Sequence, residues 1–344
     1  MSESPHAEQR TPFVLGKPIK NPSDFYGRQK VLANLFRAIL NIELVSVVGE
    51  HRCGNTSVLY MLAHEEQRQR HLSRADDAGL LFAFLSCQLA SEGPDSFYRR
   101  LALAARRVDP DATVDFGGVV DRVWVEGYLE DLAHRGRRLV LLLDELEVIA
   151  GFDETFWEWL QVLVTEYDVP VIASTRFDLS QYRAERGGPP FFNLFRSLYI
   201  GSFSPETVEQ FLREKSEITD FDFFAVRDTL QALAGRFPFY LQVAAALFYF
   251  HAGGESHVTE AQRQAVINDF KARTWTLFED AWPKLPPIER EALVWLCGDG
   301  RPHGEAEMRF QKALQSLERR GYVIDGQIFS SAFADFVREH AAMG

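Results

Sequence analysis

The chain has 344 residues, of which 46% are hydrophobic and 25% charged, a composition typical of a globular protein long enough for two or three domains. Its formal net charge of -12 argues against a general binder of nucleic acids or anionic membranes, because phosphate groups are held chiefly by excess lysine and arginine. The three cysteines form no C-x-x-C pair and the polar first ten residues contain no apolar signal core, so we expect a reduced, cytoplasmic protein without a zinc site or a membrane span.

Short apolar runs alternate with helical patterns over residues 12–203. A polar stretch over 1–11, which we expect to be disordered, precedes a helix predicted at 29–40 from its apolar spacing. The strands predicted next are 44–48, 80–86, 139–143, 169–174 and 198–201, and the helices predicted between them are 56–69, 95–107, 119–135 and 156–167. Apolar strands separated by helices indicate a mostly parallel sheet covered on both faces, so we expect residues 12–203 to form one α/β domain.

Only helical patterns follow this domain. Ser204 and Pro205 begin a predicted helix as its cap and first-turn residue, and helices continue to residue 283 with breaks at 235–238 and 252–254. We therefore expect residues 204–283 to form an all-helical domain. Residues 284–344 are predicted to contain helices at 288–297, 305–320 and 333–340, with a hairpin at 321–329 before the last helix. This order is typical of a winged-helix domain.

Residues 49–57 read Gly-Glu-His-Arg-Cys-Gly-Asn-Thr-Ser, which follows the phosphate-binding pattern G-x-x-x-x-G-K-[ST] except at Asn55. An apolar strand precedes the loop and a helix follows it, as this pattern requires. Gly49 and Gly54 allow the backbone to wrap around phosphates, which main-chain N–H groups and the helix dipole can hold without any side chain. Thr56, followed by Ser57, stands where a hydroxyl would bind Mg2+ with ATP or ADP. The alternative is a tight turn that binds nothing.

Asn55 removes the positive charge that the lysine of this pattern places against the outer phosphates. Its neutral amide leaves charge compensation to Mg2+ and to neighbouring groups, of which Arg52 is one candidate. The sequence therefore predicts a site that binds a nucleotide but catalyses its hydrolysis poorly.

Two carboxylates, Asp144 and Glu145, end a strand of consecutive aliphatic residues. We expect this strand end to lie beside the phosphate loop, with Asp144 holding Mg2+ through water and Glu145 polarising the attacking water. The alternative is a strand that simply exits into solvent. The loop and the acids occur in the expected order, which favours the nucleotide site over both alternatives.

The next strand ends in Ser174, Thr175 and Arg176. Ser174 or Thr175 could detect the terminal phosphate by a hydrogen bond, and Arg176 could supply positive charge there. An ordinary polar strand exit explains these residues equally well.

Candidates for the rest of the nucleotide lie farther along the chain. Tyr26 and Arg28, in the segment before the first helix, are the candidates to lie near the base or ribose. The break at 235–238 could present Arg236 or Pro238 to the nucleotide, and a loop that merely breaks a helix is the alternative.

Taken together, the chain resembles the STAND class of P-loop NTPases within the AAA+ and ORC-like group. The resemblance is carried by residues 21–28, the phosphate loop, 141–145, 189–195, 235–239 and the predicted winged helix. It implies that ATP or ADP binds between the α/β core and a helical lid, that ADP holds a closed state, and that some relatives assemble into oligomers, in part in antiviral defence. The chain departs from the family at Asn55 and at Arg236, where relatives often have histidine.

The leading hypothesis is an ATP-binding switch with weak or absent hydrolysis that regulates a partner protein or self-associates. An active ATPase that uses Arg52, Arg176 or a neighbouring subunit's Arg196 is one alternative, and a scaffold without nucleotide is another. DNA binding through the winged helix is less favoured, because residues 284–344 contain eight lysines and arginines but nine acidic residues.

Overall fold

The computed structural model describes residues 12–110, 112, 119–298 and 304–343. The chain forms two compact units, one of Pro18–Ile200 and the other of Met1–Lys17 together with Gly201–Gly344. Each unit is described by itself. The disorder predicted for residues 1–11 lies outside the described residues.

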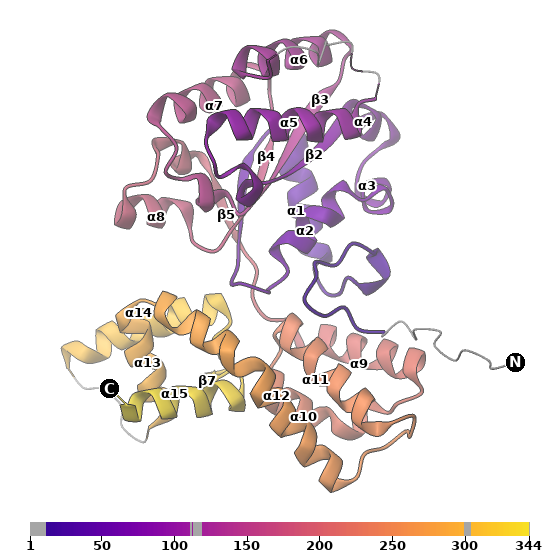
Figure 1. The fold of residues 1–344 in the computed structure, drawn as a ribbon, viewed down its shortest axis with the longest axis vertical. Coiled ribbons are helices and arrows are strands. Elements are labelled where there is room, and N and C mark those ends of the chain that lie inside the picture. Colours follow the sequence, from indigo (N-terminus) through magenta and orange to yellow (C-terminus); the bar gives the residue numbers. More distant parts are fainter. Residues whose placement is uncertain (1–11, 111, 113–118, 299–303, 344) are drawn as a thin grey trace, which may run out of the picture. The chain divides into compact units, whose positions relative to one another are not determined.

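The unit of Pro18–Ile200 is built on a five-stranded sheet in which every pairing is parallel (Figure 1). Its strand order is β2-β3-β4-β1-β5. The strands are β1 (Leu44–Val48), β2 (Leu80–Ser86), β3 (Arg138–Asp144), β4 (Val171–Thr175) and β5 (Arg196–Tyr199). The predicted α/β fold with a mostly parallel sheet is therefore confirmed, and the near-continuous apolar runs reflect burial on both faces.

Strand β4 lies between β1 and β3, because Val171 pairs with Leu44 on one side and with Leu141 on the other. The strand of Asp144 is thus not a direct neighbour of the loop strand, but its end still lies beside the phosphate loop as predicted, because Thr56 at the start of α2 contacts Asp144. Sequence order does not determine spatial order in a parallel sheet, in which strands are joined by long crossovers.

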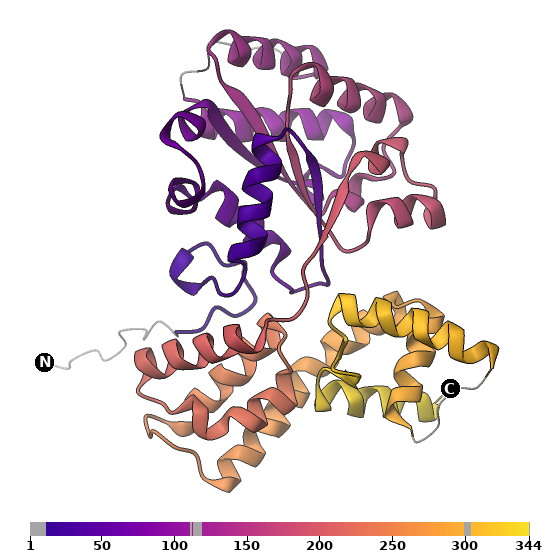
Figure 2. The same cartoon turned by 180° about the vertical axis from the view of Figure 1, so that it is seen from behind.

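Helices cover both faces of the sheet (Figures 1 and 2). On one face α1 (Gln29–Leu40) packs against β1 and β4, and α2 (Asn55–Ala63) packs against β2, β3 and β4. On the other face a single apolar core joins alternate strand residues, such as Leu81, Ala83 and Leu85, to α5 (Pro94–Val108), α6 (Arg122–His134) and α7 (Glu154–Glu166). The alternation follows from the two-residue period of a strand.

Several predicted boundaries are wrong for local reasons. The single helix predicted at 56–69 is two helices, α2 and α3 (Glu65–His71), because His64 is extended and its ring accepts a hydrogen bond from the backbone N–H of Glu66. The helix predicted at 119–135 begins at Arg122, where Asp121 caps it. The strand predicted at 198–201 is β5, which ends at Tyr199.

Two short helices were not predicted, although capping residues mark both. Ser73 caps α4 (Arg74–Gly79) and Asp178 caps α8 (Leu179–Arg186). Six single-turn 3-10 helices complete the described part of the chain: Pro22–Asp24, Cys87–Ala90, Leu146–Ile149, Pro190–Leu194, Phe223–Val226 and Trp282–Lys284.

Where the structure describes it, the second unit is helical apart from one hairpin. Its elements are α9 (Pro205–Thr219), α10 (Arg227–Ala234), α11 (Pro238–Ala252), α12 (Glu260–Ala281), α13 (Pro287–Cys297), α14 (Glu305–Arg320), β6 (Val323–Ile324), β7 (Gln327–Ile328) and α15 (Ser331–Met343). Ser204 caps α9 and the predicted breaks at 235–238 and 252–254 are present, whereas the break between α9 and α10 was not predicted. The hairpin turns at Asp325-Gly326, both with positive φ, as an Asp-Gly turn should.

The break at 235–238 lies against the C-terminal hairpin. Gly235 has a φ of +56°, and a Cβ there would lie 2.2 Å from the carbonyl oxygen of Phe329, so only glycine fits. The backbone N–H of Phe203 donates to the carbonyl of Arg236 over 2.7 Å, and the Arg236 guanidinium contacts Asp325. These contacts account for Gly235 and Arg236 by packing within this unit.

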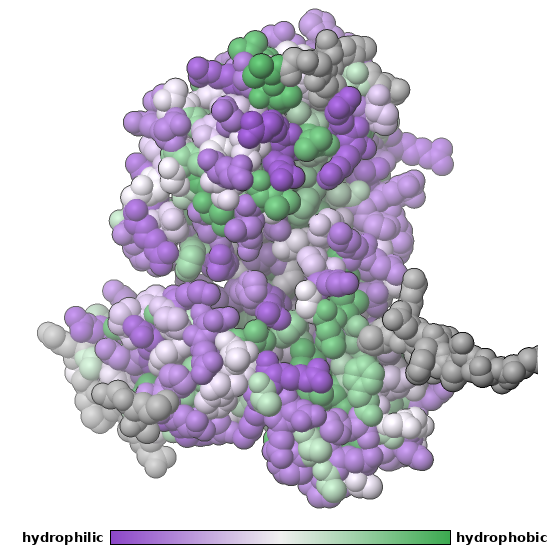
Figure 3. Space-filling model, in the orientation of Figure 1, coloured by the Kyte–Doolittle hydropathy of each residue, from purple (hydrophilic) through white to green (hydrophobic). Residues whose placement is uncertain are grey.

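Hydrophilic residues dominate the molecular face seen in Figure 3, and the hydrophobic residues on that face gather in patches of different size. No helix among the described residues is both long enough and apolar enough to cross a bilayer.

We predict that Asp109→Asn destabilises the α/β unit by ~3 kcal/mol, because it breaks a buried charge pair and leaves its partners unmatched. Asp109 is 1% exposed and accepts hydrogen bonds from Tyr128, Arg135 and Arg137, and the Arg135 contacts hold its pKa below the usual range despite burial. Urea unfolding measures the loss. The exposed pair of Glu66 and Arg70 is the control, since Glu66→Gln should cost less than about 1 kcal/mol. Equal losses in the two variants would contradict this account.

We predict that Asp178 makes stability pH-dependent in acid. Burial raises the pKa of Asp178, but hydrogen bonds from Ser180, Ser197, Gln181 and Tyr199 outweigh it and lower the pKa to about 2. The ionised form therefore stabilises the fold above the unfolded-state pKa of about 3.9, and this contribution is lost as the pH falls through about 2. Wild type should exceed Asp178→Asn by about 1–2 kcal/mol in unfolding free energy at pH 6, after allowance for solvent screening, and the gap should close between pH 4 and pH 2. A gap that does not depend on pH would refute the assignment.

Candidate nucleotide-binding site

The loop between β1 and α2 has the backbone geometry of a tight turn into a helix. Gly54 caps α2 with a φ of +99°, and Arg52 also has a positive φ, of +72°. The N–H of Gly49 donates to the carbonyl of Thr175 at 3.1 Å, which ties the start of the loop to the end of β4. A Cβ on Gly49 would lie 2.4 Å from Asn55 Oδ1 and 2.9 Å from the carbonyl oxygen of Ile200, so glycine is required there.

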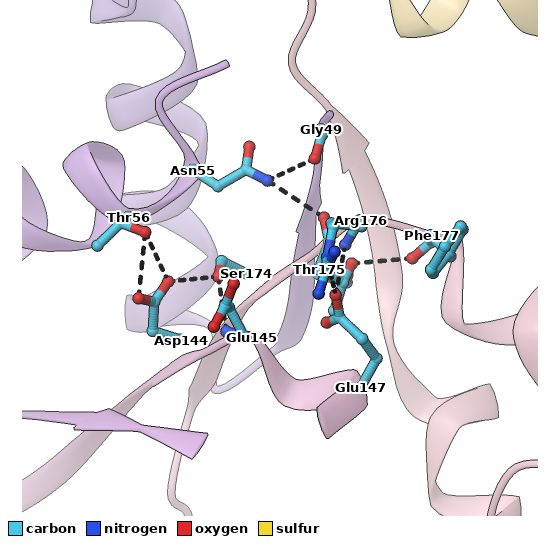
Figure 4. Close-up of polar contacts among 11 residues, drawn as sticks. Gly49, Asn55, Thr56, Asp144, Glu145, Glu147, Ser174, Thr175, Arg176 and Phe177 are labelled. Carbon is cyan, nitrogen blue, oxygen red and sulfur yellow. Dashed lines mark hydrogen bonds and ion pairs between the residues drawn. The ribbon is translucent and has the colours of Figure 1, made fainter. Parts of the chain in front are cut away.

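Asn55 turns its amide inward on the loop. Its Nδ2 donates to the carbonyl of Gly49 at 2.6 Å and to the carbonyl of Thr175 at 3.3 Å (Figure 4). Its Oδ1 is buried and has no hydrogen-bond partner among the described residues. The two amide hydrogens therefore serve the main chain of the loop and of β4, and the side chain brings no positive charge to the site.

The end of β3 places Asp144 against the first turn of α2. Thr56 Oγ1 donates to Asp144 Oδ1 and Oδ2 at 3.0 and 3.1 Å, although β4 separates the two strands concerned. The carboxylate is 7% exposed, and burial raises its pKa against the opposing hydrogen bonds from Ser174 and Thr56, with Glu145 raising it further. A hydroxyl and a carboxylate side by side form an oxygen donor set of the kind that Mg2+ prefers, so these residues fit that ion.

Ser174 on β4 connects the two acids. Its Oγ donates to Asp144 Oδ1 at 2.6 Å and accepts the backbone N–H of Glu145 at 2.9 Å. That second bond holds Glu145 in the left-handed region, at a φ of +58°. Thr175 points elsewhere: its Oγ1 lies 2.6 Å from Ser46 Oγ and donates to the carbonyl of Phe177. Of the two hydroxyls considered for this strand end, Ser174 is the one brought to the acids.

Arg176 ends this strand and pairs with Glu147, which lies in the 3-10 helix after β3. Glu147 Oε1 accepts the backbone N–H of Arg176 at 3.1 Å and its Nε–H at 3.2 Å. The carboxylate side chain is 6% exposed and the arginine side chain 33%. Burial raises the pKa of Glu147, and hydrogen bonds from backbone N–H groups and the charge of Arg176 oppose that shift.

The other predicted residues are spread more widely. Ser57 is buried in the first turn of α2, where its Oγ accepts the N–H of Ile19 at 3.0 Å. Tyr26 and Arg28 are buried before α1, and burial lowers the pKa of Arg28 against an opposing effect of nearby Cys53 in the loop. Pro238 is the first residue of α11 in the other unit.

Sequence reasoning did not single out Glu147 and did not commit to Ser174. The signal for Ser174 was present, because a strand alternates its faces and neighbouring hydroxyls must point opposite ways. The only sign of Glu147 in the sequence was its position as a third acidic residue soon after Asp144 and Glu145. The neighbouring sequence does not indicate that it pairs with Arg176.

Comparison with solved structures shows the same fold in distant proteins. The Walker-type ATPase of Pyrococcus abyssi has 13% identity and a TM-score of 0.62, with 94% of this chain and 98% of that chain covered. The ORC2 protein of Aeropyrum pernix, in its ADPNP–ADP complexes, has 12% identity and a TM-score of 0.58, with 96% of each chain covered. The ORC1 protein of Aeropyrum pernix, in complex with DNA, has 16% identity and a TM-score of 0.50, with 93% of this chain and 95% of that chain covered.

The chain matches none of the curated proteins compared with it. A family model does match: the model of novel STAND NTPase 2 covers residues 41–258, from the strand before the phosphate loop into the helical unit. This match spans more than half of the chain, and it agrees with the parallel sheet, the loop and the acid-ended strand described above. The chain belongs to the novel STAND NTPase 2 family.

Proposed function

We propose that this NTPase-family chain is an ATP-binding switch that hydrolyses ATP slowly or not at all. One observation carries the proposal. Asn55 stands where the pattern has lysine, and its amide donates hydrogen bonds to the carbonyls of Gly49 and Thr175. The contact between Thr56 and Asp144 and the tight turn of the loop backbone are nevertheless present. The loop backbone and the Mg2+ ligands serve nucleotide binding, whereas the missing lysine would act mainly in the hydrolysis step.

Binding rests first on the backbone. The N-terminus of α2 and the loop that leads into it present main-chain N–H groups and the positive end of a helix dipole, which together attract phosphate without a cationic side chain. The relatives support an adenine nucleotide, since the ORC2 protein of Aeropyrum pernix is described in ADPNP–ADP complexes. The buried Tyr26 and Arg28 remain the candidates for the base or ribose.

Thr56 and Asp144 would hold Mg2+, whose charge would offset that of the phosphates in place of the lost lysine. Glu145 would orient a water molecule as general base, and Ser174 keeps its backbone in place for that role. Arg176 and Arg52 are the candidates for charge near the terminal phosphate. Loss of one charge-assisted contact in a water-excluded site costs about 2–4 kcal/mol in the transition state, which is the reason to expect slow turnover.

The remaining assignments belong to the same proposal. Residues 12–203 would be the NTPase domain, 204–283 a helical lid and 284–344 a winged-helix domain, in which α13, α14, the hairpin and α15 follow the required order. With eight basic and nine acidic residues, this last domain suits a protein partner or self-association better than DNA. The nucleotide-dependent change would then regulate a partner protein in the cytoplasm.

We predict that ATP with Mg2+ raises the melting temperature of the wild-type protein by about 2–8 °C at saturation, because a ligand of the folded state stabilises it. Asp144→Asn should lose most of the shift that depends on Mg2+ and keep the rest. The exposed Glu154, on the first turn of α7, supplies the control, since Glu154→Gln should keep the full shift. No shift in wild type at millimolar ATP would count against nucleotide binding.

We predict that Asn55→Lys raises the rate of phosphate release from ATP about 30- to 1,000-fold, because it restores a charge that acts in the transition state. Glu145→Gln in the Asn55→Lys background should abolish the gain. Phosphate release in single-turnover reactions measures both effects. Brisk release by the wild type that Glu145→Gln abolishes would instead favour the active-ATPase alternative.

A further inference from the structure

The peptide unit between Thr175 and Arg176 is held from two sides. Its carbonyl, on Thr175, accepts from the N–H of Gly49 at 3.1 Å and from Asn55 Nδ2 at 3.3 Å. Its N–H, on Arg176, donates to Glu147 Oε1 at 3.1 Å. One peptide plane at the end of β4 thus connects the phosphate loop to a carboxylate that follows β3 (Figure 4).

The same oxygen of Glu147 also accepts the Nε–H of Arg176 at 3.2 Å. A carboxylate that binds both the main chain and the side chain of one residue restricts rotation of that side chain. Glu147 is itself rigidly placed, because it lies in the 3-10 helix Leu146–Ile149 and its side chain is 6% exposed. The guanidinium orientation is therefore set by a buried group and not by solvent.

A guanidinium has five N–H donors, and only the one on Nε is committed here. Neither η nitrogen of Arg176 has a hydrogen-bond partner among the residues that the structure describes, and the side chain is one-third exposed. The η nitrogens form the edge of the fork that matches two oxygens of a phosphate. Arg176 can thus bind an anion without leaving Glu147.

Moving Arg176 away from Glu147 would be costly. Glu147 Oε2 is already buried without a hydrogen-bond partner among the described residues, so movement of the guanidinium away would leave a buried carboxylate with no cation beside it. A phosphate would therefore bind next to an arginine that is already in position. Such a preorganised cation stabilises negative charge without having to move first.

We propose that Glu147 is a positioning residue for ATP recognition: it holds Arg176 by Nε–H and backbone N–H so that the η nitrogens face the terminal phosphate and discriminate ATP from ADP. The inference rests on the proposed ATP binding and deepens it. It assigns a role to an acid that touches no nucleotide and explains how a chain without the loop lysine keeps a fixed cation at the site.

The test compares affinities for ATP and ADP, with Mg2+, by titration calorimetry of the full chain. The variants are Glu147→Gln, Arg176→Gln, Arg176→Lys and the double variant Glu147→Gln/Arg176→Gln. Arg68→Gln is the control, because Arg68 is also a partly buried arginine paired through Nε, at 2.7 Å from Asp77 and with 25% of its side chain exposed. Melting curves show whether each variant is folded.

We expect Glu147→Gln and Arg176→Gln each to reduce the ATP-over-ADP preference on the order of tenfold, and the double variant to reduce it no further. Arg176→Lys should behave like Arg176→Gln, because lysine keeps the charge but has no fork and no Nε–H. Arg68→Gln should keep the wild-type preference. A wild-type preference in Glu147→Gln, or losses that multiply in the double variant, would overturn the proposal.

A second measurement needs no nucleotide. In NMR spectra of the wild type, the Nε–H of Arg176 should exchange with water at least about tenfold more slowly than in Glu147→Gln, because a buried carboxylate protects it. Equal exchange in the two proteins overturns the positioning role. If this protection is present but wild type binds neither nucleotide, the proposed ATP binding has failed and the assignment of Arg176 to a phosphate falls with it.

Discussion

The carbonyl oxygen of Thr175 is the point on which the site depends. It accepts hydrogen bonds from the first glycine of the loop and from Asn55, and it ends the strand that separates the loop strand from the acid strand. Because β4 lies between β1 and β3, its end contacts both the phosphate loop and the carboxylates. The side chains of Ser174 and Arg176 extend this connection to Asp144, Glu145 and Glu147.

In this arrangement the asparagine at the lysine position has a structural role in the loop. A lysine would bring a mobile charge on a flexible stem, whereas Asn55 contributes one hydrogen bond within the loop, to Gly49, and one that fixes the loop to β4 at Thr175. Of the arginines considered for the site, Arg176 is held by a buried carboxylate and Arg28 is itself buried. We propose that such a site holds a nucleotide in a defined geometry and turns it over slowly, as a switch would.

Much of the fold was predictable because its signals are local. The bounds of α1, β1, β2 and α14 agree with the apolar patterns, and the phosphate loop lies between a strand and a helix as its glycines require. The order of the strands was not predictable, because crossovers through helices leave no trace in short windows of sequence. For the same reason the pairing of Glu147 with Arg176, 29 residues apart in sequence, appears only in the structure. The break at His64 is a different case, since an imidazole is an uncommon helix cap and apolar spacing alone runs through it.

The central claim is that main-chain amides at the start of α2 bind a polyphosphate although the loop lacks its lysine. Equilibrium dialysis of the purified chain against radiolabelled ATP with Mg2+ tests this most directly. The account predicts saturable binding that approaches one nucleotide per chain and that excess unlabelled ATP displaces. Counts equal to those of the buffer compartment up to millimolar ATP, with a protein that is folded by circular dichroism, would contradict it.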